Sequence, residues 1–214
     1  MEQAGSKSRL PAATTVTDSE RILAFWFGPD PDDAGIAKEK KRIWWDADPA
    51  IDAEIRARFG DLVEAASRNE LADWAETPRG LLALIVLTDQ FPRNIHRRTP
   101  LAFAFDGAAR TYCKHGIARG FDVQLRPIER VFHYLPLEHS EVLDDQHESV
   151  RLFSELAQFA PPEQKDLYAG YLKYAERHRD IIARFGRFSH RNRILGRPST
   201  AEEEEFLRQP GSSF

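Results

Sequence analysis

Three residues near the middle of the chain are of types used in acid–base chemistry. Glu138 and His139 are adjacent, and His133 lies five residues before Glu138. Because a histidine side chain titrates near neutral pH, a Glu–His pair is able to exchange a proton with a substrate. His178, farther along the chain, is another acid–base candidate. The alternative is that Glu138 and His139 pack a turn and cap the neighbouring helices.

The same residues do not have the spacing of a metal site. A zinc-binding His-Glu-x-x-His helix places both histidines on one face, whereas this chain has His-x-x-x-x-Glu-His with Pro136 inside it. The sequence also has no Gly-rich phosphate loop, no Cys-x-x-Cys pair and no nucleophile elbow. We therefore expect neither a bound metal nor another cofactor.

A carboxylate and an amide follow the most apolar segment of the chain. Asp89 and Gln90 come one helical turn after apolar residues, so we expect them to be buried or to line a cavity. An unpaired buried carboxylate is costly, and Arg93, four residues on, is the expected partner of Asp89. This cluster is either part of a functional site or a structural polar network that fixes a chain reversal at Pro92.

A basic segment, residues 181–201, contains five arginines and no acidic residue. An arginine fork binds a carboxylate or phosphate through two parallel hydrogen bonds. The alternative is structural, since some of these arginines lie at a helix C-terminus and the acidic run Glu202–Glu205 follows directly. The candidate ligand contacts in this segment are Arg187, His190, Arg191 and Asn192.

Two polar residues fall on the apolar stripes of predicted helices. They are His178 and Gln146, and each must find a hydrogen bond if its stripe is buried. A lone polar residue of this kind is usually satisfied within the core. Because the two residues lie on different predicted helices, the alternative is that both face one shared polar pocket.

We expect the pairs Arg93-Asn94 and Arg191-Asn192 to contribute to one polar site. Each pair follows an expected helix end, at Pro92 and Gly186, where side chains are free to face a cavity. Each offers a guanidinium beside an amide, which suits a carboxylate or phosphate. The residues expected to form the ligand site are Asp89, Gln90, Arg93, Asn94, His133, Gln146, Arg187, His190, Arg191 and Asn192.

Three functions are consistent with these patterns. The first is a binding protein that holds a small anionic ligand or a peptide carboxylate in a polar pocket. The second is an enzyme that uses Glu138 and His139, or His178, as acid–base groups and arginines as anion clamps. The third is a structural module that binds another protein.

Helix start and stop signals recur along the chain, and the alternation typical of strands is nearly absent. Residues 81–87 are apolar on every side, as in a central buried helix, which we expect to end at Pro92. Another helix is expected to end at Pro136. Seven or eight helices joined by short turns indicate an all-α fold of stacked antiparallel pairs. The predicted helices begin near residues 18, 49, 78, 106, 127, 140, 163 and 200.

Length and composition limit the class of protein. The chain has 214 residues and a formal charge of −4, which argues against a nucleic-acid binder with a large basic face. Its longest apolar run is far shorter than the ~20 residues that a membrane span needs. The single cysteine, Cys113, favours a reducing compartment, so we expect a cytoplasmic protein. We expect a loose tail at 1–16 and one helical domain at 17–214; the oligomeric state is left open.

Several strings in the chain resemble those of one family of bacterial proteins, domain of unknown function 924. The resemblance covers about residues 17–214 and implies a helical fold similar to that of tetratricopeptide repeats, without an established activity. The strings are Phe25-Trp26-Phe27-Gly28, Asp89-Gln90-Phe91-Pro92-Arg93-Asn94-Ile95, Leu135-Pro136-Leu137-Glu138-His139-Ser140-Glu141, and Phe185-Gly186-Arg187-Phe188-Ser189-His190-Arg191-Asn192 followed by Ile194-Leu195-Gly196-Arg197 and Ser199-Thr200.

Overall fold

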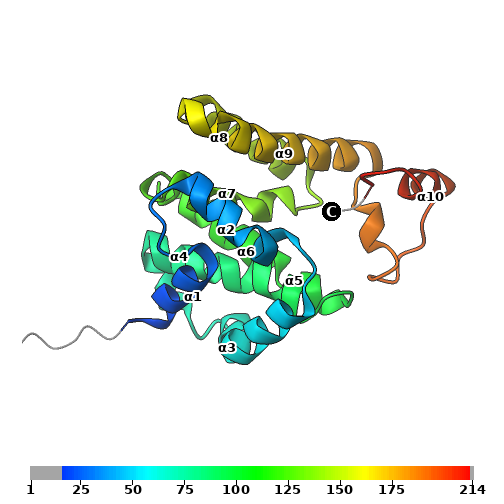
Figure 1. Ribbon diagram of the computed structural model, residues 1–214. Coiled ribbons are helices and arrows are strands. Elements are labelled where there is room, and N and C mark those ends of the chain that lie inside the picture. Colours follow the sequence, from blue (N-terminus) through cyan, green and yellow to red (C-terminus); the bar gives the residue numbers. More distant parts are fainter. Residues whose placement is uncertain (1–15, 213–214) are drawn as a thin grey trace, which may run out of the picture.

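The computed structural model describes residues 16–212, which form an all-α structure without a strand (Figure 1). The tail predicted for residues 1–16 lies, except for its last residue, outside this range. The described α-helices are α1 (Asp18–Phe27), α2 (Asp33–Trp45), α3 (Pro49–Ser67), α4 (Pro78–Ile85), α5 (Phe91–Ile95), α6 (Asp106–Ala118), α7 (Pro127–Glu138), α8 (Leu143–Phe159), α9 (Lys165–Phe185) and α10 (Ala201–Leu207).

Short polar motifs fix where several helices begin. The Asp48 carboxylate accepts a hydrogen bond from the first turn of α3, and Thr77 caps α4 in the same way. Both helices have proline as their first residue, where a missing N–H costs nothing. Thr200 and Glu203 form a reciprocal capping box at α10. These starts agree with the sequence signals.

Helix α4 lies at the centre of the molecule. Every residue from Leu81 to Leu87 is buried, and α4 packs against α1, α6 and α7. A helix that is apolar all round buries its whole circumference, so neighbours surround it and fix its position. Among the described residues, no helix has the length and the apolar character needed to cross a membrane.

Two prolines do not end their helices as predicted. Pro92 is the second residue of α5, which continues from α4 through a π-helical turn, η2 (Val86–Gln90). Pro136 lies inside α7, only two residues before its end. Pro92 directly follows the π turn, where the backbone hydrogen bonds already depart from the α-helical pattern, and Pro136 is followed by only two more residues of its helix.

Helix α2 was not predicted as a helix, because its middle is a run of charged residues. Its apolar side nevertheless buries Ile36 and Trp44. The Trp44 ring lies 4.6 Å from that of Phe132, and its indole N–H donates to the Trp26 carbonyl at 3.0 Å. This aromatic cluster fastens α1 and α2 to α7.

The C-terminal half consists of a long hairpin and a smaller capping segment. Helices α8 and α9 pack side by side and cover α7 (Figure 1). Gly186 ends α9 in a left-handed conformation that glycine adopts without strain. The chain then returns as a 3-10 turn, η6 (Ser189–Arg191), toward the C-terminal end of α7, and this return brings the basic segment to the central helix. The tetratricopeptide-like superhelix stays a prediction.

Candidate functional site

A π-helical turn places polar groups inside the central helix. The turn η2 (Val86–Gln90) contains one extra residue relative to an α-helix, and Asp89 within it is 0 % exposed. Single π turns of this kind are frequent at functional sites, because the bulge redirects side chains and their backbone groups. The expectation that Asp89 and Gln90 are buried is confirmed.

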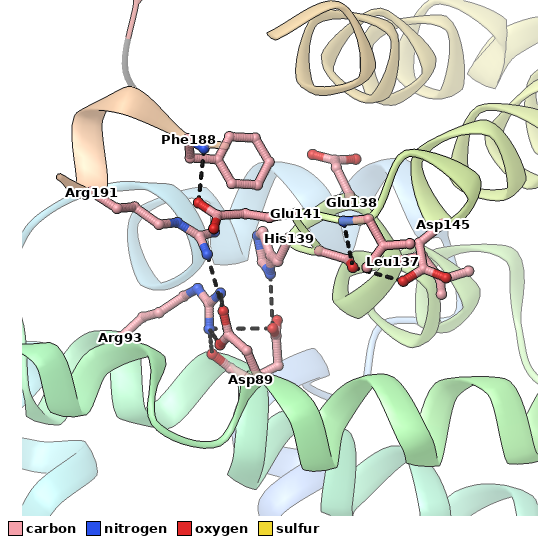
Figure 2. A network of polar contacts seen from close by, with 12 residues as sticks. Asp89, Arg93, Leu137, Glu138, His139, Glu141, Asp145, Phe188 and Arg191 are labelled. Carbon is pink, nitrogen blue, oxygen red and sulfur yellow. Dashed lines mark hydrogen bonds and ion pairs between the residues drawn. The ribbon is translucent and has the colours of Figure 1, made fainter. Parts of the chain in front are cut away.

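The Asp89 carboxylate has three side-chain partners, of which Figure 2 shows His139 and Arg93. Its Oδ1 lies 2.8 Å from Nδ1 of His139 and 3.2 Å from Nη1 of Arg93, and the Gln90 amide donates to Oδ2. Burial by itself would raise the pKa of Asp89, but the charge of Arg93 and the contact with His139 outweigh it and hold this pKa below the ordinary value. Asp89 is therefore an anion at neutral pH, and Arg93 is its predicted partner.

His139 is positioned by this carboxylate. Burial and the charge of Arg93 lower the pKa of His139, although Asp89 acts in the opposite direction. The ring is therefore neutral at pH 7, and it carries its proton on Nδ1, which faces the Asp89 carboxylate. The other ring nitrogen, Nε2, has no hydrogen-bond partner within residues 16–212 and is left as an acceptor.

Asp106 joins the two arginines that the sequence predicts to converge. Arg93 binds it through two hydrogen bonds, of 2.9 and 3.1 Å, and Nη1 of Arg191 contacts the same carboxylate at 3.2 Å. Figure 2 shows the two guanidinium groups pointing toward each other. The predicted convergence of Arg93 and Arg191 is thus present in the structure, although Asp106, which joins them, was not among the predicted site residues.

Arg191 is a nearly buried cation. The residue is 6 % exposed, and its guanidinium stacks over the rings of Phe103 and Phe188 at 4.6 and 4.5 Å. Burial and the charge of Arg93 lower the pKa of Arg191 to about 10, so it stays charged at neutral pH. Its Nε is buried without a hydrogen-bond partner in the described residues.

Of these groups, Asp106, His139 and Arg191 line a cleft of about 380 Å³. The polar wall includes Arg110 and Ser140, and neither was predicted as a site residue. The cleft lies between the start of α6, the end of α7 and the segment after α9. Its lining residues are Pro100, Phe103, Ala104, Asp106, Gly107, Arg110, Pro136, His139, Ser140, Glu141, Arg191 and Leu195.

Glu138 and His178 form a second buried pair, outside the lining of the cleft. Oε1 of Glu138 lies 3.2 Å from Nδ1 of His178, which also donates to the Tyr174 carbonyl at 2.9 Å. Burial, with a contribution from Asp89, raises the pKa of Glu138 to about 8, and burial lowers the pKa of His178 to about 3. The contact therefore joins two neutral groups at pH 7. In Figure 2 the Glu138 carboxyl points away from Asp89.

Two predicted site residues have structural contacts only. The Gln146 amide donates to three backbone carbonyls at the end of α7, those of Leu137, Glu138 and Ser140, at 3.2, 2.7 and 2.7 Å. His133 contacts the Cys113 carbonyl at 3.2 Å, and burial lowers its pKa to about 4. Neither residue lines the cleft; Gln146 ties down the carbonyl end of α7, and His133 joins α7 to α6.

The two asparagines predicted beside the arginines belong to separate networks. The Asn94 amide donates to Asp52 at 2.9 Å, on α3. The Asn192 amide donates to Glu203 at 3.2 Å, and Arg187 holds the same carboxylate through two 2.7 Å bonds. These contacts anchor their own segments, so the predicted site contains the arginines without the amides.

A latch that the sequence did not reveal connects α7 to the C-terminal segment. Glu141 accepts two hydrogen bonds from Arg197, of 2.7 and 2.9 Å, and one from the Phe188 backbone N–H at 2.8 Å. His190 is half-buried beside Phe188, with ring centroids 5.7 Å apart, and burial lowers its pKa to about 4. The latch holds Arg191 over the cleft.

Within the described part of the chain, no cluster of three or more His, Cys, Asp or Glu side chains is arranged to hold a metal ion.

Comparison with known proteins gives the lineage of the chain. Residues 22–211 match the family model described as a bacterial protein of unknown function, DUF924. The chain is also similar to a solved structure, a protein of unknown function from Agrobacterium tumefaciens, with 38 % identity, a TM-score of 0.74, and coverage of 89 % of this chain and 96 % of that one. Among the curated proteins none matches. The chain therefore belongs to the bacterial family DUF924.

Proposed function

We propose that the cleft binds a small anionic ligand through Arg191. The observation that carries this proposal is the environment of its guanidinium. This group is almost buried, lines the cleft and, within residues 16–212, has one ion-pair partner, Asp106. A buried guanidinium with open donors is costly unless an acceptor is supplied, and a carboxylate or phosphate supplies two at once. The anchor is thus suited to a ligand that arrives with its own negative charge.

The charged groups around the cleft include more cations than carboxylates to pair with them. Asp106 is shared between two arginines, and Asp145 is held by both Arg110 and Lys114. The terminal nitrogens of Arg110 have no partner among the described residues. An incoming anion therefore meets two guanidinium groups whose own carboxylates are shared, and it completes the charge balance.

Part of the cleft lining is apolar. It includes Phe103, Pro136 and Leu195, beside the polar groups. A pocket with an apolar wall and a few convergent polar groups is typical of small-molecule sites. This arrangement also suits a small organic acid, or the carboxylate end of a peptide.

The same polar groups argue against a purely structural role. Replacing a buried ion network by apolar residues is often neutral or stabilising, so stability alone does not explain this one. The Asp89–Arg93–Asp106–Arg191 network reaches the cleft through Asp106 and Arg191, and these two groups are therefore available to a ligand. A protein-interaction module would not need a cation beneath its surface.

The test is calorimetric titration of the full chain at pH 7 with succinate, and separately with inorganic phosphate. We expect saturable binding of at least one, weakened about 10- to 100-fold in Arg191→Gln, because hydrogen bonds to charged groups contribute about 1.5–3 kcal/mol. Arg184→Gln is the matched control, since Arg184 is exposed, pairs with Glu202 and does not line the cleft. Equal binding by both variants would contradict an anchor at Arg191.

A further inference from the structure

We propose that His139, oriented by Asp89, is the general base of a hydrolytic site in this cleft, and that its substrates are carboxylic esters bearing a negative charge. The inference rests on the proposed anion site, because Arg191 must hold the substrate. It adds a chemical step that anion binding alone does not require.

The Asp89–His139 contact fixes the ring in the form that a base needs. The 2.8 Å contact to a buried, charged carboxylate keeps the proton on Nδ1 and leaves the lone pair on Nε2. The same carboxylate stabilises the imidazolium that forms once Nε2 accepts a proton. Arg93, bound to both Asp89 and Asp106, holds the carboxylate in place.

The base and the anchor line the same cleft. The His139 side chain is 15 % exposed, and the cleft lining also includes Arg191 and Arg110. An acid group of the substrate on Arg191 brings its ester carbonyl within the same small cavity. The unoccupied nitrogens of Arg110 are then suited to polarise that carbonyl and to stabilise the oxyanion.

Water is the attacking group, because the cleft offers no free nucleophilic side chain. Ser140 lies beside His139 in sequence, but its hydroxyl donates to Asp145 at 2.6 Å. The other hydroxylated or carboxylated residues of the lining, Asp106 and Glu141, are held by arginines. A general base with a water molecule needs no covalent intermediate.

The step balances without a further reactant. The oxygen of water forms a bond to the acyl carbon while Nε2 of His139 takes one of its protons, and the carbonyl electrons move onto oxygen. When the carbonyl re-forms, the bond to the alcohol oxygen breaks and the proton passes from Nε2 to that oxygen. The products are a carboxylic acid, which ionises, and an alcohol.

The test uses the 4-nitrophenyl half-ester of succinic acid with the full-length chain, and 4-nitrophenyl butyrate as the uncharged comparison. We expect hydrolysis of the half-ester above the buffer rate and little of the butyrate. His139→Gln is expected to lower kcat about 100-fold or more while the affinity for succinate changes less than threefold. His147→Gln, on the exposed side of α8, is the matched control and is expected to retain the wild-type rate.

A pH profile of the wild type tests the base without any variant. Charged and titratable groups face His139 from several elements: Asp89 and Arg93 from the central helix, Asp106 from α6, His178 from α9, and Arg191 with His190 from η6. Since the pKa of His139 is lowered, kcat/KM is expected to fall on the acid side with a midpoint below 6.5. A midpoint at or above 6.5, or an acid limb that does not depend on His139, would overturn the assignment.

The outcomes separate the two proposals. If succinate binds and Arg191→Gln abolishes that binding, but the half-ester is not hydrolysed or His139→Gln is as active as the wild type, the general base is wrong and the anion site stands. If neither succinate nor phosphate binds, the anion site is wrong, and the hydrolytic site fails with it. Hydrolysis lost in His139→Gln, with binding retained, supports both.

Discussion

Asp89 is the residue on which the polar network depends. Its carboxylate is 0 % exposed and is shared by His139, Gln90 and Arg93. Removing one partner of a buried ion pair leaves the other as an uncompensated charge. We therefore expect the loss of the Asp89 carboxylate to lower the free energy of unfolding, whether or not a ligand is bound.

Asp89→Ala should lower the free energy of unfolding by about 3–5 kcal/mol, because it leaves Arg93 buried with less of its counter-charge. Urea unfolding followed by circular dichroism measures this difference. Asp61→Ala, at an exposed position of α3, is the control and should change the stability by less than about 0.5 kcal/mol. An Asp89→Ala effect as small as that of the control would show that the carboxylate is solvated.

Glu138 predicts a dependence of stability on pH. Its pKa rises from 4.5 to about 8 on folding, so the folded state favours the protonated acid. The stability that this preference contributes is fully present below pH 4.5 and is lost as the pH rises to 8. Glu138→Gln keeps a neutral side chain at every pH, so its stability relative to the wild type should increase between pH 4.5 and 8, by at most about 1.4 kcal/mol per unit.

The measurement is urea unfolding of both proteins at pH 5, 6.5 and 8. His178, whose pKa is lowered on folding, stabilises the fold as the pH rises from 3 through 6.5. Because it contacts Glu138, its contribution differs between the two proteins, and the change between pH 6.5 and 8 is the part that reports on Glu138. Glu148→Gln, on an exposed carboxylate of α8, should show no such trend. A constant difference between Glu138→Gln and the wild type would show that Glu138 is ionised in the folded state.

Some of these residue contacts could be predicted from sequence and others could not. Asp89 and Arg93 are four residues apart on one helix, so helical geometry predicts their contact. His139 meets Asp89 across 50 residues, and no local pattern encodes such a distance. Asp106 has an ordinary explanation as a residue of the first turn of α6, which hides its role as a bridge between the arginines.

At the scale of elements, the latch made by Glu141 positions the segment that carries Arg191. Glu141 receives hydrogen bonds from the Phe188 N–H and from Arg197, and it follows directly on the end of α7. The small core of Ile181, Ile182 and Phe188 adds little else to hold this segment. Glu141, which also lines the cleft, thus helps to set the orientation of Arg191.

Glu141→Ala should loosen this segment while the core stays folded. We expect hydrogen exchange at the Phe188 amide to speed up at least tenfold, since that N–H loses its acceptor. Exchange in α4 should be unchanged. Glu155→Ala, which removes an exposed partner of Arg151, is the control. Equal protection of Phe188 in the two variants would show that the latch does not hold the segment.

Element boundaries were predictable where a local motif decides them. Proline at the first position of α3 and α4, and the capping box of α10, act within one turn. The prediction that the helix ends at Pro92 was wrong, because the helix continues past this residue by way of a π turn. A π turn has no sequence signature. Helix α2 was missed because two buried residues, Ile36 and Trp44, give too weak a period beside its lysines.

For the whole molecule, the all-α class followed from helix signals and nearly absent strand alternation, and the structure of residues 16–212 confirms it. The family resemblance is confirmed as well. The cleft could not be predicted, because it forms only where the start of α6, the end of α7 and the segment after α9 meet. Its ligand and the cytoplasmic location stay predictions, since neither is a property of the packing.

The central claim is that an anion binds Arg191 in this cleft. A crystal structure of the protein with selenate, whose selenium identifies the ion by anomalous scattering, tests it most directly. We predict one selenate in the cleft with an oxygen within about 3.2 Å of the Arg191 guanidinium. The claim is contradicted if crystals at saturating selenate show the ion only at surface lysines or arginines, with the cleft and Arg191 unoccupied by any anion.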